Sequence, residues 1–123
     1  MVVDDEPAVR LVALKALRAA GLQVIEAADG PTGLLAYREH ATDINLVLLD
    51  LTMPGLSGEE TLRQLRALTP DLPVIVMSGY SEAETRGRCA SLGVSGYLAK
   101  PFEISDLVTR LRPYLDQLAP PVA

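Results

Sequence analysis

The run Ile-Asn-Leu-Val-Leu-Leu-Asp at residues 44–50 has the composition of a strand that is buried on both faces. A strand of a parallel sheet is nearly continuously apolar because helices cover the sheet on both sides. Three further apolar runs, at residues 1–3, 74–77 and 97–99, share a second property with this one: each is followed at once by a polar side chain. We therefore expect four parallel strands whose carboxyl ends lie along one edge of a sheet.

The stretches between these runs have the 3.6-residue periodicity of helices. We expect strands at 1–3, 22–27, 44–49, 74–77 and 95–99, and a Pro- and Gly-rich loop at 53–58. We expect helices from Pro7 to Gly21, after Asp29, through Leu62 and Leu68, from Glu82 to Leu92 before Gly93, and after Pro101. Pro113 lacks a backbone donor and should end or kink the last helix near Arg112.

The expected order is five strands and five helices in strict alternation. Parallel strands need crossover connections, which are nearly always right-handed, so the helices should cover both faces of the sheet. The pattern predicts an α/β fold of the doubly wound type, formed by one domain of 123 residues.

Composition restricts the classes of function. The net charge of −5 argues against broad contact with nucleic acid, because neutralisation of phosphates dominates such binding. The single cysteine, Cys89, is typical of a reducing compartment, and no apolar run is long enough for a membrane helix. We expect a cytoplasmic domain without membrane contact whose partners are proteins.

The polar side chains at the strand ends are chemically complementary. They are Asp4 and Asp5, Asp50, Ser78, and Lys100 with Pro101. Ligands bind at the carboxyl edge of open α/β sheets, and carboxylates crowded there need a cation. Oxygen ligands suit a hard divalent ion such as Mg²⁺. The sequence therefore predicts a site for a metal ion and a phosphoryl group.

Each residue also has a simpler interpretation. Asp4 and Asp5 could cap the first helix, Asp50 and Ser78 could be turn residues, and Lys100 could be a solvated surface lysine. The joint arrangement favours the phosphoryl site over these separate explanations. His40 and Cys89 are expected on the surface and in the core, respectively.

Four motifs carry a resemblance to a known family. They are Val-Val-Asp-Asp-Glu-Pro at 2–7, Leu-Leu-Asp-Leu-Thr-Met-Pro-Gly at 48–55, Val-Met-Ser-Gly-Tyr at 76–80 and Gly-Tyr-Leu-Ala-Lys-Pro-Phe at 96–102. In this order they resemble the receiver domain of bacterial two-component signalling. The resemblance implies a flavodoxin-like sheet with strand order 2-1-3-4-5 and phosphorylation of Asp50 by a histidine kinase.

The resemblance also implies roles for the surrounding residues. Mg²⁺, for which Mn²⁺ could substitute, would be bound by Asp5, Asp50 and the backbone carbonyl of Thr52, and by Asp4 largely through water. Lys100 would pair with the phosphoryl oxygens, Lys100–Pro101 would be a cis peptide, and Ser78 and Tyr97 would form the switch. Thr52 and Tyr80, each two places after a site residue, would tune the lifetime of the phosphoaspartate.

The same resemblance sets the expected context. The receiver would span 1–118, with a frayed tail at 119–123, and would switch a surface formed by helix four, strand five and helix five, through which a homodimer could form. Its partner would be a histidine kinase or a histidine phosphotransfer protein. The short lead-in before Asp4 and the Met-Ser-Gly-Tyr motif favour a piece of a hybrid sensor histidine kinase over a stand-alone regulator. The isolated domain would catalyse only its own phosphorylation and dephosphorylation, although its parent protein could be a histidine kinase.

Two other classes of protein remain open from the residues. A phosphohydrolase of the haloacid dehalogenase type also places a nucleophilic aspartate after an apolar strand, but it carries an acid where this chain has Thr52, and 123 residues leave no room for a cap domain. An interaction module that is never phosphorylated would keep the fold, although such modules usually lose one of the site residues.

Overall fold

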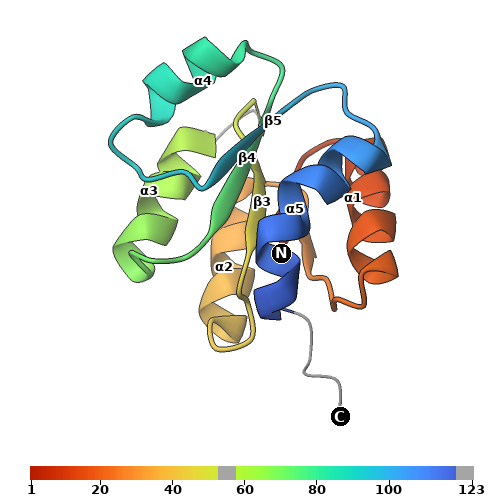
Figure 1. The fold of residues 1–123 in the computed structure, drawn as a ribbon. Helices are drawn as coiled ribbons and strands as arrows, with labels where there is room; N and C mark the ends of the chain where they lie inside the picture. Colours follow the sequence, from red (N-terminus) through yellow and green to blue (C-terminus); the bar gives the residue numbers. More distant parts are fainter. Residues whose placement is uncertain (53–57, 119–123) are drawn as a thin grey trace.

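The computed structural model describes residues 1–52 and 58–118, and within them it has five strands and five helices in alternation (Figure 1). The strands are β1 (Val2–Val3), β2 (Glu26–Ala27), β3 (Val47–Asp50), β4 (Val74–Ser78) and β5 (Gly96–Ala99). The helices are α1 (Pro7–Ala19), α2 (Gly30–His40), α3 (Gly58–Leu68), α4 (Glu82–Cys89) and α5 (Ile104–Leu118). Residues 53–57 of the predicted loop and the predicted tail over 119–123 lie outside the described residues.

The five strands form one parallel sheet in the order β2-β1-β3-β4-β5. This confirms the predicted fold class and strand order. Leu49 pairs with Val3 of β1 and with Val76 of β4, so β1, β3 and β4 end close to the same level. Residues that follow these strands are therefore brought together at the carboxyl edge.

Side chains alternate between two cores because successive residues of a strand point to opposite faces. Val3, Leu49 and Val76 pack with residues of α2, α3 and α4, whereas Val2, Leu48 and Met77 pack with residues of α1 and α5. Figure 1 shows α1 and α5 side by side on one side of the sheet, with α2 and α3 on the other. The sheet is thus covered on both faces, as the apolar runs predict.

Two strands begin three or more residues later than predicted. β2 begins at Glu26 instead of Leu22, and β3 begins at Val47 instead of Ile44. A strand extends only where a partner offers backbone groups, and β1, which lies between β2 and β3, is two residues long. Ile44 and Leu46 are nevertheless buried. Their side chains pack in the core although their residues lie outside the strand.

Three predicted helix boundaries need correction. α1 ends at Ala19 instead of Gly21, α3 begins at Gly58 within the predicted loop, and α4 ends at Cys89 instead of Leu92. The Arg66 guanidinium donates to the carbonyls of Leu92 and Gly93 at 2.7 Å each, and these tertiary bonds hold that segment outside the helix. Gly93 has a φ of +66°, a conformation that favours glycine.

The last helix does not end at Pro113 but runs through it to Leu118. Proline leaves the carbonyl four residues earlier, that of Thr109, without its helical donor. Both Thr109 and Pro113 are exposed, so water can hydrogen-bond that carbonyl.

Across 1–52 and 58–118, no helix has the length and apolar character that crossing a bilayer requires.

Candidate functional site

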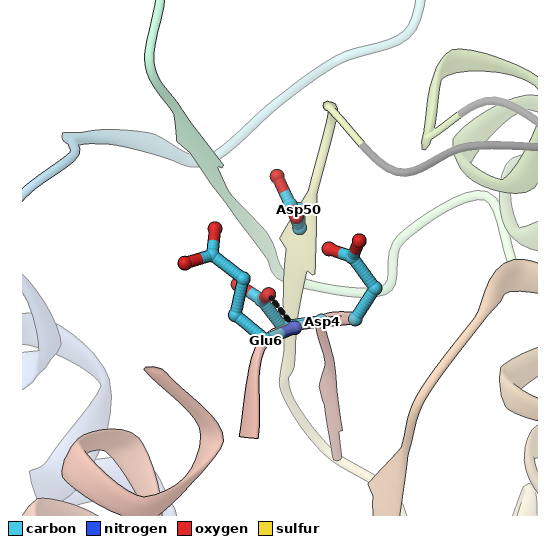
Figure 2. Close-up of side chains that lie close together, drawn as sticks. Asp4, Glu6 and Asp50 are labelled. Carbon is cyan, nitrogen blue, oxygen red and sulfur yellow. Dashed lines mark hydrogen bonds between the residues drawn. The ribbon is translucent and has the colours of Figure 1, made fainter. Parts of the chain in front are cut away.

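The polar residues at the carboxyl ends of β1, β3, β4 and β5 meet at one edge of the sheet. Asp4 and Asp50 are fully buried, and Ser78 is 3% exposed. Figure 2 shows the side chains of Asp4 and Glu6, which follow β1, grouped beside Asp50 at the end of β3. Strand order alone explains this convergence, because β1 and β4 are the two neighbours of β3.

Lys100 is the cation of the site. Its Nζ lies 2.8 Å from Asp4 Oδ2, 3.1 Å from Asp50 Oδ2 and 3.2 Å from Glu6 Oε1. Lys100 follows β5, and its backbone N–H donates to the Ser78 carbonyl at 2.8 Å, which continues the pairing of β4 with β5. The Lys100–Pro101 peptide bond is cis, as the resemblance implies.

Asp50 is oriented by the residue two places along the chain. Its Oδ1 accepts hydrogen bonds from the Thr52 backbone N–H at 2.9 Å and from the Thr52 hydroxyl at 2.7 Å. Its other oxygen, Oδ2, faces Lys100. One oxygen of the Asp50 carboxylate therefore accepts two hydrogen bonds from Thr52, and the other forms an ion pair with Lys100.

Asp4 turns the chain between β1 and α1 rather than capping the helix. Its Oδ1 accepts from the Glu6 backbone N–H at 2.8 Å, and its backbone carbonyl accepts from Arg10 at 2.6 Å. The N-cap residue of α1 is Glu6, whose side chain makes no capping bond. The simpler interpretation of Asp4 and Asp5 as helix caps is therefore wrong.

The site carries more negative than positive charge. Asp4, Asp5, Glu6 and Asp50 each offer a carboxylate oxygen, all within 4.8 Å of one another, against the single ammonium of Lys100. Burial raises the pKa of the Asp4 carboxyl, with a further rise from the Asp50 charge, while contacts with Lys100 and Glu6 oppose the shift. Burial alone would lower the pKa of Lys100, but Asp4 and Asp50 outweigh it and raise that pKa.

This donor set fits a hard divalent cation. Carboxylate oxygens are the ligands that Mg²⁺ takes in proteins. Within the described residues, neither Asp4 Oδ2 nor Asp50 Oδ2 accepts a well-aligned hydrogen bond, although both are buried. Asp4, Asp5, Glu6 and Asp50 thus form an acidic cluster that could hold such an ion. Glu6 belongs to it but was missed from the sequence, where its place directly after Asp5 was the available signal.

The other predicted residues lie around this centre. The Ser78 hydroxyl accepts a hydrogen bond from the Tyr80 backbone N–H at 2.9 Å, and the Tyr80 side chain is exposed. Tyr97, on β5, is half-buried and borders a cavity of about 220 Å³ that Ser78 also lines. His40 is exposed and Cys89 is buried, as expected.

The fold and the site together define a class: flavodoxin-like domains with an acidic pocket and a lysine at the carboxyl edge of the sheet. The sequence model of the response regulator receiver domain matches residues 1–112 of this chain. The chain therefore belongs to the response regulator receiver domain family, and its function is that of a receiver in two-component signalling.

Relatives with this domain differ in overall length. The chain is 36% identical over 115 residues to the probable transcriptional regulatory protein TcrX of Mycobacterium tuberculosis, covering 94% of this chain and 48% of that protein. It is 34% identical over 117 residues to the sensor kinase CckA of Brucella abortus, covering 95% of this chain and 12% of the kinase. It is 30% identical over 115 residues to the sporulation initiation phosphotransferase F of Bacillus subtilis, covering 94% of this chain and 91% of that protein.

Solved structures agree with this family. A CheY-like receiver domain protein from Methanospirillum hungatei superposes with a TM-score of 0.82 at 28% identity, covering 95% of this chain and 92% of that one. The chain thus matches one relative over nearly its whole length, but spans only about half of the first regulator and about an eighth of the sensor kinase.

Proposed function

We propose that Asp50 is the residue that accepts a phosphoryl group from the phosphohistidine of a histidine kinase or a histidine phosphotransfer protein. The observation that carries this proposal is the buried Asp50 carboxylate, 3.1 Å from Lys100 and beside further acidic groups at the sheet edge. An Asp50 oxygen attacks phosphorus, the new P–O bond forms as the P–N bond breaks, and the electron pair of that bond returns to the imidazole nitrogen.

Charge neutralisation is the main requirement of this transfer, because a carboxylate must approach an anionic phosphoryl group. Asp5, Asp50 and the Thr52 carbonyl would bind Mg²⁺, or Mn²⁺ in its place, with Asp4 acting largely through water. The ion would supply positive charge for the phosphoryl oxygens and align the donor. Lys100 would pair with the same oxygens and thereby exchange part of its contact with Asp4 and Asp50.

The switch would begin at Ser78. Its hydroxyl would hydrogen-bond a phosphoryl oxygen, and Tyr97 would turn inward into the space this movement leaves. The cavity of about 220 Å³ shared by Ser78 and Tyr97 supports this step. The result would be a repacked surface over α4, β5 and α5, which partners, or a second copy of this chain, would read.

Thr52 and Tyr80 would set the lifetime of the phosphoaspartate. The Thr52 hydroxyl already contacts Asp50 at 2.7 Å, and Tyr80 follows Ser78 by two residues. We expect slow self-dephosphorylation because the bulky Tyr80 side chain shields the acyl phosphate from water. Tyr80→Ala should lose the phosphoryl group several-fold faster, measured as decay of the phosphorylated mass; equal decay rates would argue against shielding.

The wider context is proposed on the same basis. The receiver unit would span residues 1–118 and would work in the cytoplasm, through proteins rather than through nucleic acid or membrane. The match to part of a sensor kinase keeps the hybrid-kinase origin open, and the match to a short phosphotransferase supports the stand-alone alternative. Beyond its own phosphorylation and dephosphorylation, we propose no enzymatic activity for the isolated domain.

Intact-mass analysis after incubation with acetyl phosphate and Mg²⁺ tests the proposal. The parent protein should gain one phosphoryl group of about 80 mass units. Asp50→Asn, or omission of Mg²⁺, should abolish the gain. Asp43→Asn is the matched control, since Asp43 is an exposed carboxylate that lines a different cavity, and it should still be phosphorylated. No gain with acetyl phosphate or with a phosphorylated histidine kinase would favour the interaction module.

A further inference from the structure

The guanidinium of Arg86 on α4 lies over the ring of Tyr97 on β5. Its central carbon is 4.5 Å from the ring centroid, within the range of a cation–π interaction. Arg86 also forms an ion pair with Glu82, one helical turn earlier, at 3.3 Å. The ion pair with Glu82 thus favours a position of the guanidinium over the half-buried ring.

The cavity beside this ring is also lined by Ser78, which belongs to the proposed phosphoryl site. Four buried residues line it: Val76 and Ser78 of β4, Thr85 of α4 and Leu98 of β5. The Thr85 hydroxyl donates to the Ser81 carbonyl within α4 at 2.9 Å, so it has a hydrogen-bond partner without the Tyr97 side chain. This cavity is the space that the Tyr97 ring would enter in the proposed switch, whereas in the structure the ring lies under Arg86.

We propose that Arg86 is a positioning residue that holds Tyr97 against α4 and so sets how readily the phosphorylated arrangement is reached. This inference rests on the proposed function, in which Tyr97 turns inward after phosphorylation of Asp50. Any contact made only in the unphosphorylated arrangement lowers the population of the other one. Loss of the Arg86 contact should therefore raise the population of the inward ring before any phosphoryl group is present.

Arg88 provides a matched control on the same helix. Its guanidinium lies 4.2 Å from the centroid of the Tyr80 ring and 3.0 Å from Glu59 of α3. Arg86 and Arg88 are both exposed, both form an ion pair and both stack on a tyrosine. They differ in which tyrosine they hold, so Arg88→Gln removes the same kind of contact without touching Tyr97.

The first readout is ¹⁹F NMR of protein labelled with 3-fluorotyrosine. The chain has four tyrosines, and Tyr97→Phe assigns the Tyr97 signal. Beryllium fluoride with Mg²⁺ is titrated as a phosphoryl analogue while this signal is followed. Arg86→Gln should lower the half-point of the titration by roughly two- to five-fold, the population change expected from one exposed cation–π contact. Arg86→Lys keeps a cation near the ring, so its half-point should lie between those of Arg86→Gln and the parent. Arg88→Gln should have the half-point of the parent.

The second readout is the rate of Asp50 phosphorylation by acetyl phosphate, measured by intact mass. Arg86→Gln should speed phosphorylation in the parent background but not in a Tyr97→Leu background, because there the ring is gone. Three outcomes would each overturn the inference and leave the proposed function intact. Arg86→Gln could have the same half-point as the parent, Arg88→Gln could shift the half-point as much as Arg86→Gln does, or Arg86→Gln could speed phosphorylation in the Tyr97→Leu background as well. A parent that neither gains a phosphoryl group nor responds to beryllium fluoride would overturn the proposed function as well.

Discussion

The Asp4 carboxylate is fully buried next to Asp50, and burial raises its pKa. A raised carboxyl pKa means that the folded protein holds this proton more tightly than the unfolded chain, so this group's contribution to stability falls as pH rises above the ordinary value of 3.8. Asp4→Asn should therefore stabilise the metal-free protein at pH 7, because the amide carries no charge to bury and the cost of burying the carboxylate outweighs its contact with Lys100. Urea unfolding at pH 7 and at pH 3.5 measures this, and the gain should shrink at the lower pH.

The Cys89 thiol is predicted to be inert in the folded protein. It is 1% exposed, and burial raises its pKa, so both access and thiolate content are low. Alkylation by iodoacetamide at pH 8 should be slower than in the urea-unfolded chain by roughly a hundredfold, because it needs an opening of the structure. Ser91→Cys, at an exposed position, should react rapidly in the folded state and serves as the positive control. Comparable rates for Cys89 and Cys introduced at 91 would contradict the packing of α4 on the core.

At the scale of elements, α3 depends on a glycine at its first residue. A Cβ built on Gly58 would lie 2.3 Å from the Asp50 carbonyl oxygen and 2.4 Å from Leu51 Cα, both backbone atoms that cannot move aside alone. Gly58→Ala should destabilise the fold by about 2 kcal/mol, as overpacking does, and should lower the rate of Asp50 phosphorylation by shifting β3. Gly87→Ala in α4 is the control, because a Cβ there meets nothing within 4 Å, and it should stabilise the fold by about 0.5–1 kcal/mol. Thermal unfolding and acetyl phosphate labelling of both variants provide the measurements.

Elements were predictable where local pattern determines them. The apolar runs located all five strands, and β3 and β4 are buried along their whole length, as strands covered on both faces should be. Ser81, whose hydroxyl accepts a hydrogen bond from the Glu84 N–H at 3.1 Å, is of a residue type preferred at the start of a helix. Boundaries set by distant residues were not predictable. Arg66 holds Leu92 and Gly93 outside α4 across 26 and 27 residues of chain, and the short β1 limits the lengths of β2 and β3.

The same distinction applies to the site. Asp4, Asp50, Ser78 and Lys100 were found because each follows an apolar run, and the sheet order then brings them together. Glu6 was missed because it follows no strand directly, and its place in the cluster depends on how the chain turns into α1. The bond from the Thr52 hydroxyl to Asp50 was missed for a similar reason, since a serine or threonine rotamer cannot be read from spacing.

At the scale of the whole molecule, the excess negative charge at the sheet edge should make folding stability depend on Mg²⁺. Four carboxylates lie close together and a single ammonium, that of Lys100, contacts three of them, so a divalent cation that binds only the folded state relieves their repulsion. At ten times its dissociation constant, Mg²⁺ should stabilise the fold by about 1.4 kcal/mol and raise Tm by roughly 5 °C. Differential scanning calorimetry with and without Mg²⁺, at constant ionic strength set with NaCl, measures the shift.

Variants separate specific binding from general screening of the acidic chain. Asp50→Asn and Asp5→Asn each remove a proposed ligand and should lose most of the Mg²⁺-dependent rise in Tm, whereas Asp43→Asn removes the same formal charge from an exposed site elsewhere and should retain it. An equal rise in all four proteins would mean that Mg²⁺ acts through the net charge of −5 instead of through the pocket. Such a result would remove the metal from the proposed chemistry while leaving Lys100 as the cation beside Asp50, because that ion pair needs no added ion.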